Sequence, residues 1–343
     1  MKIGVIGCGG HGMHHALELR KIDFVKDVIG CDLNPDIRKA AESKGFRTVK
    51  SVDDLLREKP GAVVIVTPPS VHAANIRSCI SAKIPVLCEK PLTTDLKEAV
   101  DIVELAEKTG VSLQVGFELR YCGMTRGMKD IVGSGIIGEP RYLTLVQISG
   151  SHTAPGYMSK KRAGGIFYEK LCHQIDLSRF WFGEPTRIMA HGSPSVLKHY
   201  EIHDNVTSVM EFPDDKAGKI MFITSRAAQI GGTDDHGDRG HFCEIILTCS
   251  NGSVTFDHWT GTLDVVRFNH RKDLQAELVD RVDVQKKYGE PIYDLFTQDA
   301  DFLKRVKEGR KPLYPASDAL KTMKWVEWAE QSLTKGGEWL TGK

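Results

Sequence analysis

The chain has 343 residues, a formal net charge of +1 and 41% hydrophobic residues, enough for about two domains with buried cores. The near-zero charge gives no overall attraction to nucleic acid or to an anionic membrane. No apolar stretch approaches the roughly 20 residues that span a bilayer, the N-terminus lacks the pattern of a signal peptide, and the eight cysteines form no C-x-x-C pair. We therefore expect a cytoplasmic protein with reduced thiols and with no nucleic-acid or membrane partner.

Strands and helices are predicted to alternate through the first third of the chain. Continuous apolar runs, typical of strands buried on both faces, alternate with stretches of helical periodicity. The predicted strands are 2–6, 28–32, 62–66, 85–88 and 112–117, and the predicted helices are 12–21, 35–44, 52–59, 72–82 and 95–109. This alternation predicts a doubly wound parallel sheet, a Rossmann domain that we assign to residues 1–120.

The pattern changes near residue 120, where runs with a period of two begin. After a predicted helix at 124–134, these runs are 141–149, 186–192, 206–212, 217–225, 244–250, 253–258 and 263–268. They predict a C-terminal α+β domain over residues 121–343, with a large, mostly antiparallel, open-faced sheet. Helices follow at 293–308 and 317–333, and the last is expected to pack back on the Rossmann domain. The open face favours a homo-oligomer, either a dimer or a tetramer.

A glycine-rich motif joins the first predicted strand to the first predicted helix. The run from residue 7 to residue 12 reads G-x-G-x-x-G, and Asp32 ends the next strand 20 positions later (32 − 12). In this context the pattern is the fingerprint of a dinucleotide site, in which the helix N-terminus faces the pyrophosphate. The predicted cofactor contacts in the motif are Gly7, Gly9, Gly10, His11 and Gly12.

Asp32 is predicted to distinguish NAD from NADP. Its carboxylate should accept hydrogen bonds from the adenosine ribose and repel a 2′-phosphate, so NAD is expected and NADP is the alternative. Arg38, six residues later, could either cover the adenine or reach a phosphate.

Polar tripeptides follow the third and fourth predicted strands, at the sheet edge where ligands bind in such folds. After the third strand, Thr67 and Pro68, with His72 nearby, are expected to contact the cofactor. Glu89 and Lys90 follow the fourth strand and are also expected to contact the cofactor. A charged pair at the end of a buried strand is costly unless it is paired or functional, and a surface ion pair is the alternative interpretation.

Together these features resemble the glucose–fructose oxidoreductase / inositol dehydrogenase / rhizopine-catabolism (Gfo/Idh/MocA) family. The resemblance covers nearly the whole chain and is carried by the glycine motif, Asp32, Thr67-Pro68-Pro69, His72, Glu89-Lys90-Pro91, Val115-Gly116-Phe117, Arg120, Gly164-Gly165, Glu169, His173 and Asp176-Leu177. It also implies a cis peptide bond before Pro91.

The resemblance implies that Lys90, Glu169 and His173 line a substrate pocket beside the nicotinamide. Glu169 lies four residues before His173, so both are expected on one helix face. Asp176 could lie on the same side or serve packing or capping. The predicted substrate contacts are Lys90, Arg120, Tyr157, Glu169 and His173.

Three residues depart from the family pattern. Glu169 stands where an aspartate is usual, Leu171 where a glycine is usual, and Glu118 where an asparagine is common. These changes leave the expected cofactor unaltered and concern the substrate and the acid–base assignment.

The resemblance predicts an NAD-dependent oxidoreductase that acts on a small polyol or sugar. Hydride would pass between a secondary alcohol of a sugar, inositol or glycoside and the nicotinamide. Lys90 or His173 would remove the hydroxyl proton, and Glu169 would orient one of them. The alternatives are a lyase or hydrolase that uses NAD only transiently, and a non-enzymatic NAD-sensing regulator, which would need neither Lys90 nor His173. The histidines and aspartates of residues 234–241 match no metal-ligand spacing, so no metal is expected.

Overall fold

A computed structural model describes residues 1–149, 159–193, 201–224, 241–269 and 275–341. The chain forms two compact units: Met1–Glu118 with Leu295–Lys324, and Leu119–Asp294 with Trp325–Lys343. The predicted substrate contact Tyr157 lies outside the described residues. No helix in the described ranges is both long enough and apolar enough to cross a membrane.

The first unit is built on a six-stranded parallel sheet with the strand order β3-β2-β1-β4-β5-β6. Its strands are β1 (Lys2–Ile6), β2 (Asp27–Cys31), β3 (Arg47–Val49), β4 (Ala62–Ile65), β5 (Val86–Glu89) and β6 (Leu113–Gly116). β1, β4 and β5 consist almost wholly of buried apolar residues, which explains why they read as continuous apolar runs. The predicted Rossmann sheet is confirmed, and the three-residue strand β3 was not predicted.

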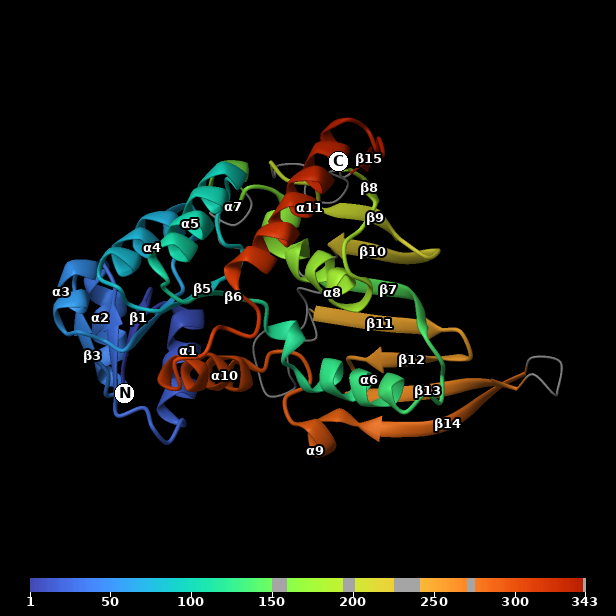
Figure 1. The fold of residues 1–343 in the computed structure, drawn as a ribbon, viewed down its shortest axis with the longest axis horizontal. Coiled ribbons are helices and arrows are strands. Elements are labelled where there is room, and N and C mark those ends of the chain that lie inside the picture. The colour runs from blue at the N-terminus through green and yellow to red at the C-terminus, as the bar shows by residue number, and fades with distance from the viewer. Residues whose placement is uncertain (150–158, 194–200, 225–240, 270–274, 342–343) are drawn as a thin grey trace. The chain divides into compact units, whose positions relative to one another are not determined.

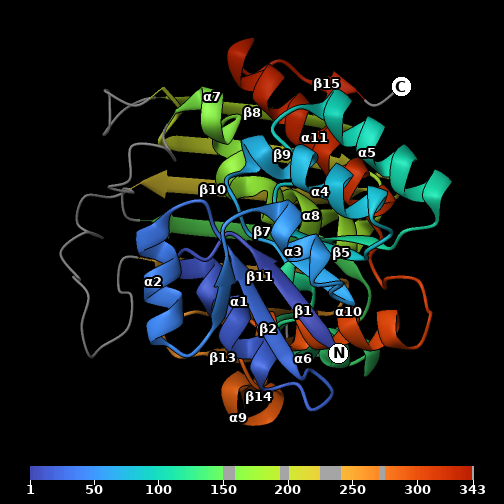
Figure 2. The ribbon, with the colours of Figure 1, turned by 90° about the vertical axis from the view of Figure 1, so that its left-hand side faces the viewer.

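Helices cover both faces of this sheet, with α4 and α5 on one face and α1 and α10 on the other (Figure 1). Figure 2 shows α1, α2 and α3 beside β1 and β2. The helices are α1 (Gly10–Arg20), α2 (Pro35–Ser43), α3 (Val52–Arg57), α4 (His72–Ser81), α5 (Leu96–Thr109) and α10 (Leu295–Lys307), with a 3-10 turn η1 (Pro69–Val71). Asn34, Ser51 and Asp95 cap the helices α2, α3 and α5 by accepting a backbone N–H in the first turn.

Helix α10 joins the first unit from far along the chain. Phe302 and Leu303 are fully buried in the same apolar cluster as Val5 and Leu19. Residues 295–324 therefore belong with the N-terminal sheet, although the sequence places them after the second sheet.

The second unit contains a nine-stranded sheet with the order β14-β13-β12-β11-β7-β10-β9-β8-β15. Its strands are β7 (Pro140–Ser149), β8 (Arg187–Ser193), β9 (Asn205–Phe212), β10 (Lys216–Thr224), β11 (His241–Cys249), β12 (Gly252–Asp257), β13 (Thr262–Asn269), β14 (Gln275–Asp283) and β15 (Leu340–Thr341). Every pairing is antiparallel except that of β7 with β10, so the predicted sheet type is confirmed. The strands β14 and β15 were not predicted.

Helices α6 and α8 pack on this sheet, α8 against β7 and β10 and α6 against β12 and β13 (Figure 1). The helical elements here are η2 (Glu118–Arg120), α6 (Gly123–Gly133), α7 (Lys160–Ala163), η3 (Phe167–Leu171), α8 (Cys172–Phe182), α9 (Val284–Tyr288) and α11 (Ala316–Thr334). Residues 316–324 of α11 belong to the first unit and the rest to the second.

Candidate active site

The glycine-rich turn between β1 and α1 is closely packed at two glycines and open at two others. A Cβ atom at Gly7, where φ is 92°, would lie 2.7 Å from the carbonyl oxygen of Val66, and one at Gly12 would lie 1.8 Å from that of Gly7. Around Gly9 and Gly10 a Cβ atom would meet nothing within 4 Å. The turn therefore leaves room beside the N-terminus of α1, whose first turn has no side-chain cap. These residues fit the pyrophosphate of a dinucleotide, which free N–H groups and the positive helix end stabilise.

Asp32 fixes the position of this turn. Its Oδ2 accepts a hydrogen bond from the backbone N–H of Cys8 at 2.9 Å, and its Oδ1 accepts one from Asn34 at 2.9 Å. Arg38 folds back on the same segment, where Nη1 donates to the carbonyl oxygens of Asp32 at 2.8 Å and Leu33 at 3.0 Å. The carboxylate of Asp32 and the guanidinium of Arg38 thus lie at the end of β2, where the ribose of a dinucleotide binds in this fold.

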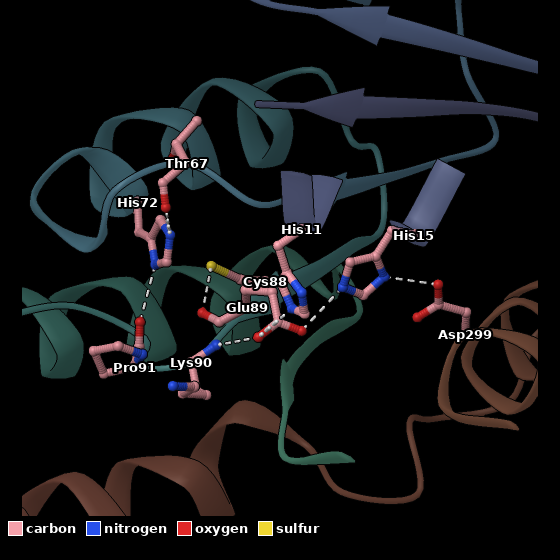
Figure 3. Close-up of polar contacts among 9 residues, drawn as sticks. All are labelled: His11, His15, Thr67, His72, Cys88, Glu89, Lys90, Pro91 and Asp299. Carbon is pink, nitrogen blue, oxygen red and sulfur yellow. Dashed lines mark hydrogen bonds and ion pairs between the residues drawn. The ribbon is translucent and has the colours of Figure 1, made fainter. Parts of the chain in front are cut away.

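His72 ties two loops of the sheet edge together. It is fully buried, and its Nε2 lies 2.7 Å from the carbonyl oxygen of Thr67 while its Nδ1 lies 2.9 Å from that of Pro91 (Figure 3). Burial lowers the pKa of His72, although both carbonyls favour the protonated ring. The side chain of His72 therefore supports Thr67 and Pro91 from the protein interior.

A series of buried ionisable side chains ends at Glu89, the residue before Lys90. His15 is fully buried, with Nδ1 2.8 Å from Oδ2 of Asp299 and Nε2 3.1 Å from Oε1 of Glu89 (Figure 3). Burial opposes the charge of His15, but the two carboxylates raise its pKa to about 10. Burial also opposes the charge of Glu89, yet His11 and His15 hold its pKa well below the usual range. Asp299, His15 and Glu89 thus form a buried hydrogen-bonded series in which His15 bridges two carboxyl groups, and burial raises the pKa of Asp299 although His15 acts against that shift.

The series of side chains Asp299, His15 and Glu89 positions the backbone of Lys90. The backbone N–H of Lys90 donates to Oε2 of Glu89 at 3.2 Å, and the peptide bond between Lys90 and Pro91 is cis, as the resemblance implied. Since Glu89 pairs with Gly116 in the sheet, the residues that follow β5 and β6 leave the same edge. Glu118, two residues after Gly116, is buried there.

Three of these groups have the donor spacing of metal ligands. One atom each of His11, His15 and Glu89 lies within 4.8 Å of the other two. Because both ring nitrogens of His15 contact carboxylates, ion pairing accounts for the grouping. The run 234–240 lies outside the described residues.

In the second unit, Glu169 and His173 lie where two kinds of helix meet. Glu169 belongs to η3, which has π-helical hydrogen bonding, and His173 belongs to the first turn of α8. A π-helix has a wider turn than an α-helix, so the expectation that these residues share a face by simple α-helical spacing does not apply. Both side chains are partly buried, and Oε2 of Glu169 lies 3.7 Å from Nζ of Lys170.

Side chains of α11 hold this π-helical segment in place. The carboxylate of Glu330 accepts the backbone N–H of Phe167 at 2.7 Å, and the hydroxyl of Tyr168 donates to Glu327 at 2.7 Å. Gly165, with φ of 149°, admits the Glu330 carboxylate, because a Cβ atom there would lie 2.3 Å from it. Such π-segments are frequent at functional sites.

Arg120 and Asp176 form a buried bidentate ion pair. Nε and Nη2 of Arg120 each lie 2.6 Å from one oxygen of Asp176, and the two side chains are 5% and 2% exposed. Of the two possibilities for Asp176, this geometry favours the structural one. The predicted substrate contact Arg120 directs its guanidinium at this carboxylate.

The structure gathers the predicted site residues into two groups. In the first unit the glycine turn, Asp32, Thr67, His72 and Lys90 lie at the carboxyl edge of the sheet. Arg120, Glu169 and His173 belong to the second unit. Sequence reasoning missed His15 and Asp299. The four-residue spacing of His15 from His11 could have pointed to His15, whereas no local signal marks Asp299.

Comparison with known proteins decides the family. Residues 1–117 match the model of an oxidoreductase family with an NAD-binding Rossmann fold, and residues 125–255 match the GFO/IDH/MocA C-terminal domain. The chain belongs to the Gfo/Idh/MocA family. This confirms the resemblance seen in the sequence and the prediction of an NAD(P)-dependent dehydrogenase that acts on CH–OH groups.

Two curated proteins illustrate the similarity. The chain is 31% identical to myo-inositol 2-dehydrogenase of Thermotoga maritima over 244 residues, which cover 68% of this chain and 71% of that protein. It is 30% identical to the uncharacterized oxidoreductase YrbE of Bacillus subtilis, over 66% of this chain and 68% of that protein.

Solved structures share the fold over almost the full length of the chain. An oxidoreductase from Agrobacterium radiobacter in complex with NAD+, L-tartaric acid and magnesium matches with a TM-score of 0.81 and 19% identity, covering 99% of this chain and 98% of that one. A myo-inositol dehydrogenase from Corynebacterium glutamicum matches with a TM-score of 0.79 and 20% identity, covering 100% of this chain and 99% of that one.

Proposed function

We propose that this protein oxidises a secondary alcohol of a small polyol, sugar, inositol or glycoside, with Lys90 and His173 as proton-transfer groups. The placement of Lys90 carries the proposal: its backbone is held by a buried carboxylate at the sheet edge that also presents the glycine-rich turn. Relatives named inositol 2-dehydrogenase support the substrate class.

The residues of each unit then have separate tasks. A bound nicotinamide supplies the acceptor for the hydride. Lys90 or His173 removes the hydroxyl proton as the alcohol becomes a carbonyl, and Glu169 orients one of them. The first unit accordingly binds the cofactor and supplies Lys90, and the second supplies Glu169 and His173 for the substrate.

The substrate class is tested by a screen for NAD reduction over inositols, hexoses and glycosides. We expect at least one polyol or sugar to give net NADH. Conversion of a glycoside without net NADH would contradict a plain dehydrogenase and indicate a reaction that uses NAD only transiently.

NAD is the proposed cofactor rather than NADP. The negative charge of Asp32 disfavours a 2′-phosphate, and Nη1 of Arg38 is hydrogen bonded to two backbone carbonyls. Because like charges in contact cost several kcal/mol, we expect NADH to bind about tenfold or more tightly than NADPH in a fluorescence titration. Asp32→Asn should reduce the difference in affinity between NADH and NADPH. Tighter binding of NADPH than of NADH by the wild type would refute the assignment.

That the protein is cytoplasmic and that it forms a homo-oligomer both stay predictions. We expect a dimer or tetramer by light scattering, formed through the open face of the nine-stranded sheet.

A further inference from the structure

Glu118 is a buried carboxyl group at the sheet edge that carries Lys90. It lies two residues after the end of β6, at a position where the family resemblance leads one to expect an asparagine, and is only 5% exposed. Residues 89 and 116 pair in the parallel sheet, so Lys90 and Glu118 both leave the carboxyl ends of neighbouring strands. A buried carboxyl group requires a compensating partner or a function.

Glu89 places a fixed negative charge next to Glu118. A Cβ atom at Gly116 would lie 2.5 Å from Oε1 of Glu89, so this carboxylate packs against the backbone two residues before Glu118. His15, itself bound to Asp299 at 2.8 Å, keeps Glu89 ionised. The Glu89 charge is thus a permanent part of the surroundings of Glu118.

These surroundings bring the titration of Glu118 close to neutrality. Burial and then the charge of Glu89 raise the pKa of Glu118 to about 7, while Lys90 and His11 act in the opposite direction. Within the first unit the charged groups that act on Glu118 are Glu89 and Lys90, at the end of β5 and just after it, and His11 on α1. A carboxyl group with this pKa can both accept and release a proton under physiological conditions.

We propose that Glu118 accepts the proton that Lys90 removes from the substrate hydroxyl. This inference rests on the proposed function and deepens it. In alcohol oxidation, the substrate O–H bond breaks as an N–H bond forms at Nζ of Lys90. A Lys90 N–H bond then breaks as an O–H bond forms on Glu118. The substrate carbon gives up a hydride, with its electron pair, to the nicotinamide. The alcohol thus loses two electrons and two hydrogens and becomes a carbonyl.

The proposal assigns a definite task to the residue that departs from the family pattern. An asparagine at position 118 could hold a hydrogen bond but could not take up a proton. With Glu118 ionised, Lys90 has an acceptor after the end of the neighbouring strand and returns to its neutral form for the next turnover. Glu118 therefore acts through Lys90 and need not touch the substrate.

The first readout needs neither substrate nor turnover. In an infrared pH titration of the protein without cofactor, the band of a protonated carboxyl group should disappear with a midpoint near pH 7. Glu118→Gln should remove one component of that band. Glu330 is the matched control, since burial raises its pKa to about 7 in the second unit, and Glu330→Gln should remove a different component.

The second readout is the pH dependence of kcat/KM for alcohol oxidation. The wild-type rate should fall below about pH 7 as Glu118 becomes protonated, because a protonated carboxyl group cannot accept from Lys90. Glu118→Gln should lower kcat/KM at pH 8 about 10²-fold. It should also abolish the acidic limb of the profile, the fall in kcat/KM below about pH 7, and leave the affinity for NADH unchanged. Glu118→Asp should restore the limb, which a purely structural loss would not allow.

The outcomes separate this inference from the function on which it rests. If Lys90→Met is inactive and Glu118→Gln keeps both the wild-type limb and the full infrared band, only the role of Glu118 is overturned. If Lys90→Met retains full turnover, the proposed function fails, and a proton path through Lys90 fails with it.

Discussion

Replacing Lys90 by methionine is expected to lower kcat for alcohol oxidation by about 10²- to 10⁴-fold, the usual contribution of a proton-transfer group. Methionine retains a long apolar stem but cannot exchange a proton. The hydrogen bond that fixes residue 90 comes from its backbone N–H, so the main chain should keep its position after Glu89. Steady-state measurement of NADH formation at saturating NAD and substrate gives the effect.

Cofactor binding should survive the Lys90→Met substitution. The predicted phosphate contacts are backbone groups of the glycine turn, and Asp32 is held by N–H groups of Cys8 and Asn34. We expect the NADH dissociation constant, from fluorescence titration, to change less than threefold. Lys97→Met, an exposed lysine in α5 of the same unit, is the control and should leave both kcat and binding unchanged. Unaltered kcat in Lys90→Met would remove Lys90 from the mechanism.

Local rules of backbone geometry explain why the cofactor half of the site could be predicted from the sequence. Gly7 and Gly12 are required by clashes with atoms only a few residues away or on the adjacent strand. The position of Lys90 follows from a buried apolar strand and the rule that ligands bind at the carboxyl edge of a parallel sheet. Such constraints can be recognised within a short stretch of sequence.

The remaining features depend on residues far apart in the sequence. Asp299 lies 284 positions from His15, and nothing near it in the sequence indicates that α10 returns to the N-terminal sheet. The π-helical turn at 167–171 is likewise held by Glu330 in α11, so residue spacing alone could not reveal the changed relation of Glu169 to His173. These contacts had to be observed in the folded structure.

The ion pair between Arg120 and Asp176 offers a test of what burial contributes to the stability of the second unit. The exposed pair of Arg281 and Asp264 has the same bidentate geometry, with both contacts at 2.6 Å in each pair. The side chains of the first pair are 5% and 2% exposed, and those of the second are 61% and 31% exposed. Geometry is thus matched, and burial differs.

Asp176→Ala should lower the free energy of unfolding by about 3–5 kcal/mol, because it leaves the Arg120 guanidinium charged and buried without its carboxylate. Asp264→Ala should lower it by no more than about 1 kcal/mol, because water solvates the exposed Arg281. All five tryptophans belong to the second unit, so tryptophan fluorescence during urea unfolding reports on the unit that holds both pairs. Equal losses in the two variants would show that burial does not set the contribution of Asp176. A loss of turnover in Asp176→Ala without any loss of stability would instead favour the alternative in which Asp176 lies on the same side as His173 and serves the active site.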